Sequence, residues 1–188
     1  MPRALDLNEI PGIIEDFRLA CLRAIDAGFD GVEVHGAHGY LLDAFLRDGT
    51  NHRTDAYGGP IANRSRLLVE VTKACATAIG ADRLGVRISP VSTAGDSHDS
   101  QPQALFNHVV EALNPLGLAY VHVVEGETGG PGTVSRSIMP RCARGSTASG
   151  WSIMGMIARW RWRPWRAAGL IWCRLDGCSS RTRIWWRV

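Results

Sequence analysis

The chain has 188 residues and a hydrophobic content of 45%, which is enough for one packed domain or for part of a larger one. It contains no apolar run of about 18 residues, which argues against a membrane span. The N-terminus MPRALDLNEIPG lacks a basic-then-apolar signal pattern, and the five cysteines form no Cys-x-x-Cys pair. We therefore expect a cytoplasmic protein in a reducing compartment.

The net charge of +3 conceals an uneven distribution. Residues 1–133 hold 10 Lys+Arg and 17 Asp+Glu, a net charge of −7, whereas residues 134–188 hold 11 Arg and one acid, a net charge of +10. All seven Trp also lie after residue 150. These differences predict two segments of different character, residues 1–132 and residues 133–188.

The elements predicted in chain order alternate between helices and strands. Apolar residues at three-to-four spacing indicate helices, and short β-branched runs bounded by Gly or Pro indicate strands. The expected elements are a helix over 13–27, a strand over 31–35, a short helix over 41–46, a helix over 65–79, a strand over 84–88, a helix over 102–113 and a strand over 120–124. This order predicts an α/β fold with a parallel sheet covered by helices.

The most informative stretch is GVEVHGAHGY, residues 31–40, where a β-branched strand runs into glycine-punctuated chain. It delivers His35, His38 and Tyr40 to the carboxyl edge of the predicted sheet, the edge at which such folds place their sites. Imidazoles can donate hydrogen bonds to a carbonyl oxygen and a phenol can supply a proton, so the pattern indicates a carbonyl clamp with a proton donor beside it.

Two other interpretations of the three side chains are open on the pattern alone. One is structural, with a strand-end His bonded to backbone, a second His in solvent and a Tyr in the core. The other is a zinc site on His35 and His38, which would need at least a third ligand that no motif in the sequence supplies.

Four stretches together resemble the middle of the Old Yellow Enzyme family of FMN-dependent ene-reductases. They are GFDGVEVHGAHGYLLDAFL, NHRTDAYGGPIANRSRLLVEV, RLGVRISP and VEGETGG, in the order and at the spacing of that family. The resemblance covers residues 1–132. It implies part of a (β/α)8 TIM barrel, about strands four to six with the third to fifth helices.

The resemblance also implies roles for particular residues. His35 and His38 would bind the oxygen of an α,β-unsaturated carbonyl or nitro compound, and Tyr40 would protonate its α-carbon. Arg87 would lie against the flavin, with FMN as cofactor and NAD(P)H as reductant. Some members carry Asn at the position of His38. The loop over 51–64 is expected to be scaffold, and no metal site is expected.

The resemblance ends near residue 132, and residues 133–188 form an irregular Arg/Trp-rich tail without helical or strand periodicity. Composition of this kind is typical of GC-rich DNA translated out of frame. Our hypothesis is a frameshift near codon 133, with a late start or truncation upstream, and a tail that is frameshifted or disordered. Reading the gene in its other two frames from codon 130 tests this hypothesis.

A three-strand sector of a barrel has open edges and lacks the inner layers of the other strands. We therefore expect the 188-residue polypeptide to be unstable, to bind FMN weakly or not at all, and to be inactive by itself. The alternative is a non-catalytic fragment whose basic tail adheres to nucleic acids or membrane surfaces without a specific nucleic-acid partner. The sequence does not predict an oligomeric state.

Overall fold

The computed structural model describes residues 3–93, 95 and 97–124. Beyond residue 124 it describes only the backbone of three short strands, β4 (Trp165–Ala167), β5 (Leu170–Arg174) and β6 (Arg183–Ile184), which pair antiparallel in that order. The sequence prediction of an irregular tail without strand periodicity is therefore wrong for these three segments. The remainder of the tail lies outside the described residues, and its being frameshifted or disordered stays a prediction.

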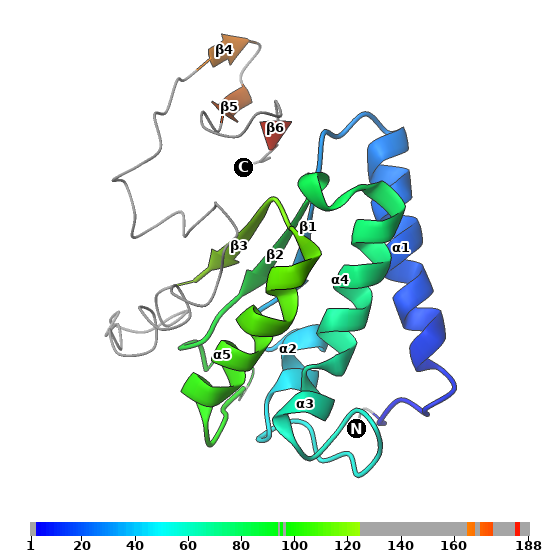
Figure 1. Ribbon diagram of the computed structural model, residues 1–188, viewed down its shortest axis with the longest axis vertical. Helices are drawn as coiled ribbons and strands as arrows, with labels where there is room; N and C mark the ends of the chain where they lie inside the picture. Colours follow the sequence, from blue (N-terminus) through cyan, green and yellow to red (C-terminus); the bar gives the residue numbers. More distant parts are fainter. Residues whose placement is uncertain are drawn as a thin grey trace.

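Helices and strands alternate as expected (Figure 1). In chain order the elements are α1 (Ile10–Asp26), β1 (Val32–Gly36), α2 (Leu41–Leu46), α3 (Ile61–Arg64), α4 (Arg66–Ile79), β2 (Leu84–Ile88), α5 (Pro102–Leu113) and β3 (Tyr120–Val123), with 3-10 turns at Ala81–Arg83 and Asn114–Leu116. Strands β1, β2 and β3 form one parallel sheet in that order.

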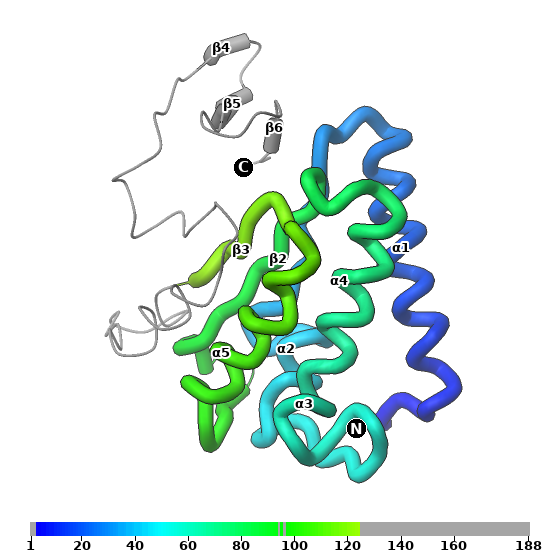
Figure 2. The backbone as a smooth tube through the Cα atoms, viewed as in Figure 1, coloured from blue at the N-terminus to red at the C-terminus, as the bar shows by residue number. Residues whose placement is uncertain are grey.

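Two boundaries differ from the sequence prediction. Helix α1 begins at Ile10 and includes Pro11 and Gly12 in its first turn, where an absent proline N–H costs no helical hydrogen bond. The separate turn α3 precedes α4, and Ser65 lies between them with its backbone still in the helical region. Figure 2 shows the N-terminal segment close to the long loop between α2 and α3. The guanidinium of Arg53 in this loop donates a hydrogen bond to the carbonyl of Leu5 at 2.6 Å.

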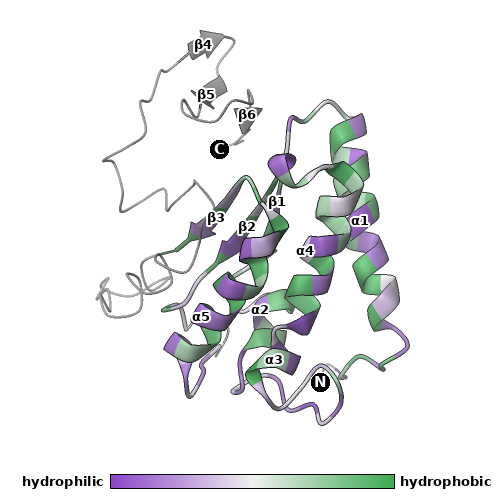
Figure 3. Ribbon diagram, viewed as in Figure 1, coloured by the Kyte–Doolittle hydropathy of each residue, from purple (hydrophilic) through white to green (hydrophobic). Residues whose placement is uncertain are grey.

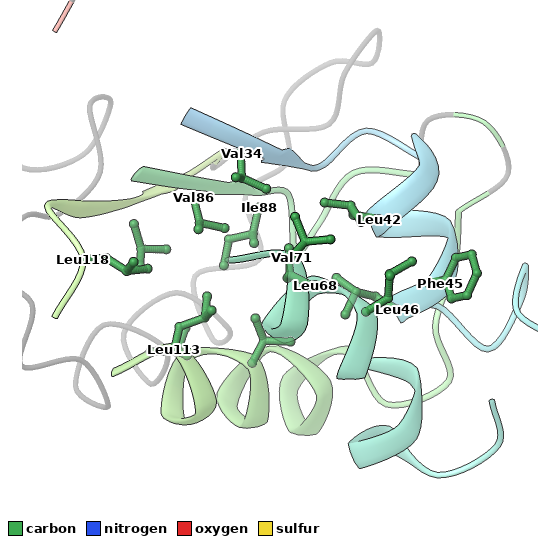
Figure 4. Packing of buried hydrophobic residues seen from close by; sticks show 14 of the residues in the cluster. Val34, Leu42, Phe45, Leu46, Leu68, Val71, Val86, Ile88, Leu113 and Leu118 are labelled. Atoms are coloured by element: carbon green, nitrogen blue, oxygen red, sulfur yellow. The ribbon is translucent and has the colours of Figure 1, made fainter. Parts of the chain in front are cut away.

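One face of the sheet is apolar and packs against the helices. Helices α4 and α5 cover this face and α1 lies alongside α4 (Figure 1), and Figure 3 shows that all three helices carry both polar and apolar residues, as one-sided burial requires. Figure 4 shows how side chains from strands and helices meet in the core. Its members include Val34, Leu42, Leu46, Leu68, Val71, Val86, Ile88 and Leu113, each at most 2% exposed.

Helix α4 approaches the sheet closely because Gly36 has no side chain. A Cβ placed there would lie 2.9 Å from Leu68 Cδ1 and 3.1 Å from the Arg87 carbonyl oxygen. Strand residues alternate between the two faces, so the residues next to the apolar ones point to the opposite side. That second face carries Glu33 and His35 on β1, Gly85 and Arg87 on β2, and Tyr120 and His122 on β3.

Candidate active site

Three side chains converge at the carboxyl end of β1. His35 is the penultimate residue of the strand, and His38 and Tyr40 lie in the short loop before α2. The ring centroids of His35 and His38 are 5.6 Å apart, and those of His35 and Tyr40 are 5.4 Å apart. Tyr40 is 67% exposed, so the interpretation of this residue as a core tyrosine is wrong.

The sheet register places Arg87 beside this group. Arg87 of β2 is the direct neighbour of His35 on one side and of His122 on the other. Its Nε is buried and has no hydrogen-bond acceptor among the described residues. A buried, unpaired donor of this kind is uncommon and calls for an acceptor from outside the described chain.

The two histidines are biased toward their neutral forms. The pKa values of His35 and His38 both lie below the ordinary value of 6.5. Burial is the larger cause for each ring, and the positive charge of Arg87 is the next. At pH 7 each ring therefore has one N–H donor and one acceptor nitrogen. The described residues contain no group of three or more His, Cys, Asp or Glu arranged to hold a metal ion.

The loop that carries His38 has an unusual backbone. His38 has a φ of 58°, the only described non-glycine residue with a positive φ, and Gly39 follows with a φ of 75°. The His38 N–H donates to Ser89 Oγ at 2.8 Å, and the Gly39 N–H donates to Asp43 Oδ2 at 2.9 Å.

A buried ion pair lies directly beneath this loop. Asp43 is 0% exposed and Arg47 is 2% exposed, and Arg47 Nε donates to Asp43 Oδ1 at 2.9 Å. A terminal nitrogen of Arg47 also donates to the carbonyl of Ser89 at 2.6 Å, and the guanidinium lies 4.7 Å from the ring centroid of Phe106. Sequence reasoning missed this pair, although an Asp and an Arg four residues apart in the apolar run LLDAFLR were a usable signal.

A second polar pair crosses the sheet face. His122 Nδ1 lies 3.1 Å from Glu33 Oε2, linking β3 to β1 across β2. Burial and the neighbouring Glu33 raise the pKa of Tyr120, which keeps its phenol protonated. The alternation Tyr-Val-His-Val over residues 120–123 contained this signal, but the partner of His122 is 89 residues away.

The long loop after α2 makes the contacts of a scaffold, as expected. Asn51 donates from its amide to the carbonyls of Phe45 at 2.6 Å and Tyr57 at 2.7 Å. Arg64 is buried and donates to three acceptors, two of them backbone carbonyls. These acceptors are the carbonyls of Gly59 and Leu46 and the carboxylate of Asp99.

Residues 1–139 match the model of the NADH:flavin oxidoreductase / NADH oxidase family. The chain belongs to this family. It is 49% identical over 142 residues to 12-oxophytodienoate reductase 2 of Arabidopsis thaliana, and 55% identical over 129 residues to 12-oxophytodienoate reductase 7 of Oryza sativa subsp. japonica. These matches cover 74% and 66% of this chain, but only 38% and 33% of the two relatives.

Solved structures are also similar to this chain. Morphinone reductase superposes with a TM-score of 0.76 at 38% identity, over 81% of this chain and 41% of that enzyme. The Old Yellow Enzyme homologue from Zymomonas mobilis gives a TM-score of 0.74 at 38% identity, over 80% of this chain and 43% of that protein. The resemblance to Old Yellow Enzyme is therefore confirmed, with three parallel strands and their helices matching these barrel proteins over part of their length.

Membership of the NADH:flavin oxidoreductase family does not by itself assign roles to residues of this chain. The roles of His35, His38, Tyr40 and Arg87 stay predictions, now with a geometry that can be tested. None of the described helices combines the length and apolar character of a transmembrane segment.

Proposed function

We propose that this chain supplies the substrate-binding rim of an FMN-dependent ene-reductase, an enzyme that uses NAD(P)H to reduce an alkene conjugated to a carbonyl or nitro group. The observation that carries the proposal is that the rings of His38 and Tyr40 lie 5.6 and 5.4 Å from the ring of His35, at the sheet edge where Arg87 lies. The carboxyl edge of a parallel sheet is where α/β folds bind ligands.

His35 and His38 bind the substrate oxygen. Because burial and Arg87 lower the pKa of both rings, each is neutral near pH 7 and donates through one N–H. Two donors on one oxygen draw electron density from the conjugated alkene and stabilise the negative charge that develops on the oxygen.

Tyr40 donates the proton that completes the reduction. Its side chain is 67% exposed, yet its ring lies 5.4 Å from that of His35. The phenol thus reaches the space next to the bound oxygen, where its O–H can protonate the α-carbon.

Arg87 fits one contact of the flavin. Its buried Nε has no acceptor among the described residues, and a flavin ring edge offers carbonyl and nitrogen acceptors. When bound, FMN supplies to the β-carbon the hydride that it receives from NAD(P)H. Arg87 would hold the pyrimidine edge, and its charge favours negative charge on that ring.

Ligands in solved relatives support small-molecule binding at sites of this family. One relative, TcOYE, was solved with pHBA, and morphinone reductase was solved with tetrahydroNAD. The chain spans 33% to 43% of the relatives described above, so the complete reaction is proposed for the whole barrel. In the described sheet, β1 and β3 each pair only with β2, and we expect the 188-residue polypeptide by itself to bind FMN weakly or not at all.

The test is a flavin titration followed by an assay of NADPH oxidation with 2-cyclohexenone. In a complete barrel that carries these residues and has FMN bound, Tyr40→Phe is expected to lower turnover about 10²–10⁴-fold, the range for loss of a general acid. Tyr57→Phe is the matched control, because the Tyr57 hydroxyl donates to Glu70 at 2.8 Å outside the site. His35→Leu, which removes the N–H donor, is expected to cost about 10²–10³-fold, the range for one oxyanion donor.

Two outcomes would count against the proposal. Equal turnover in Tyr40→Phe and Tyr57→Phe would remove the proton-donor role. Stoichiometric FMN binding with no reduction of any activated alkene would remove the ene-reductase assignment. Failure to bind FMN at all would instead favour the non-catalytic alternative for this polypeptide.

A further inference from the structure

We infer that Asp43 and Ser89 are positioning residues, which hold the backbone of the loop between β1 and α2 so that its three rings face one space. The inference rests on the proposed function for what the rings do, but its geometry stands without that function. The two residues act through hydrogen bonds to the backbone amides of His38 and Gly39.

The loop needs such support because of its backbone. His38 has a φ of 58° and Gly39 a φ of 75°, two left-handed residues in succession. A residue with a Cβ rarely adopts this conformation unless hydrogen bonds fix it. This reversal lets His38 return toward His35, to a ring separation of 5.6 Å.

Asp43 fixes the backbone at Gly39, the second of the two left-handed residues. Its Oδ2 accepts the Gly39 N–H at 2.9 Å, and its Oδ1 accepts Arg47 Nε at 2.9 Å. Asp43 is fully buried, so the carboxylate cannot exchange these donors for solvent. Because Asp43 lies in the first turn of α2, the loop and the helix that begins after Tyr40 are oriented together.

Ser89 fixes the backbone at His38, the first of the two left-handed residues, and connects it to the neighbouring strand β2. Its Oγ accepts the His38 N–H at 2.8 Å, and its carbonyl accepts an Arg47 N–H at 2.6 Å. Ser89 is 0% exposed and directly follows β2, two residues after Arg87. The bonds therefore join the loop between β1 and α2 to the end of β2, the strand that carries Arg87.

Ser65 has a buried hydroxyl in a different arrangement. Ser65 is 1% exposed, and its hydroxyl donates to the carbonyl of Ala62 within the same turn, at 3.2 Å. Removing that hydroxyl disturbs only a local bond. Ser65→Ala is thus a matched control for Ser89→Ala, with the same substitution, similar burial and a hydroxyl that bonds within its own turn.

The test uses the full 188-residue chain, labelled for NMR, with amide exchange and inter-ring NOEs as readouts. Ser89→Ala is expected to speed exchange of the His38 amide at least about 10-fold and to weaken the NOEs between the His35 and His38 rings. Ser65→Ala is expected to leave both readouts unchanged. The inference is overturned if Ser89→Ala leaves the His38 amide and the ring NOEs as they are in the parent chain.

A second variant guards against simple loss of folding. Asp43→Ala combined with Arg47→Met removes the buried charges together, so that neither is left unpaired. It is expected to keep the amide protection of α4 while the Gly39 amide exchanges at least about 10-fold faster. Unchanged Gly39 protection in a folded double variant overturns the role of Asp43. Neither readout requires flavin or substrate, so these experiments test the positioning role independently of the turnover assay, which tests the proposed function.

Discussion

Arg64 gives the sharpest test of the physical reasoning about the scaffold loop. Its side chain is 5% exposed and pairs with Asp99, whose side chain is fully buried. The Arg64→Met variant keeps the apolar stem but removes the charge and every N–H donor. Leu46 and Gly59 then lose a donor to their carbonyls, and Asp99 loses its buried cation.

The expected cost follows from burial. Breaking a buried ion pair by removing one partner typically costs about 3–5 kcal/mol. Asp99 keeps two backbone donors, from Asp48 at 3.0 Å and Gln101 at 2.8 Å, which places the expected loss at the lower end, about 3 kcal/mol. Since small domains have about 5–15 kcal/mol in total, this is a large fraction of the stability.

Urea unfolding followed by circular dichroism at the helical band is the assay, because this signal reports directly on the helices that cover the sheet. Arg64→Lys is expected to recover only part of the loss, since an ammonium cannot reproduce the planar fork. Arg3→Met is the control. Arg3 makes comparably short contacts with Glu9, at 2.6 and 2.7 Å, but its side chain is 67% exposed. An equal effect of Arg64→Met and Arg3→Met on the unfolding midpoint would refute the argument from burial.

Three further predictions concern the core, the histidines and the tail. Leu68→Ala should cost about 2–5 kcal/mol in urea unfolding, because Leu68 is fully buried against the sheet, whereas the exposed Leu7→Ala should stay within about 0.5 kcal/mol. Because the folded pKa values of His35 and His38 are lowered, their contribution to stability is present above about pH 6.5 and is lost as pH falls through the lowered values. His35→Gln should therefore reduce the fall in unfolding midpoint between pH 7.5 and pH 5. An unchanged fall would contradict a lowered pKa of His35 in the folded state. The net charge of +10 on residues 134–188 should give binding to single-stranded DNA that weakens with salt and has no sequence preference, and a clear preference in competition assays would be inconsistent with it.

Local patterns were sufficient for the order of elements and for the faces of the helices. The apolar positions expected to be buried in α5, such as Leu105 and Val109, are fully buried, and the strand limits agree within a residue. The convergence of His35, His38 and Tyr40 was also predictable, because a strand followed by glycines places them at one sheet edge.

The buried charges could not be predicted in the same way. Arg47 and Arg64 are ordinary surface residues by type. Each has one partner nearby in sequence, Asp43 and Gly59, but their burial also depends on partners that are distant in sequence. The Ser89 carbonyl lies 42 residues from Arg47, and the Asp99 carboxylate lies 35 residues from Arg64. No local periodicity encodes such pairings, so the support beneath the candidate site became visible only in three dimensions.

The backbone at position 38 also limits which amino acids can be selected there. A φ of 58° excludes β-branched side chains in practice and favours glycine, asparagine, aspartate and histidine. Donation of a hydrogen bond to a neutral oxygen at pH 7 removes glycine and aspartate from that set. Histidine and asparagine satisfy both filters, so a mutational library at this position should find its functional solutions among these two residues.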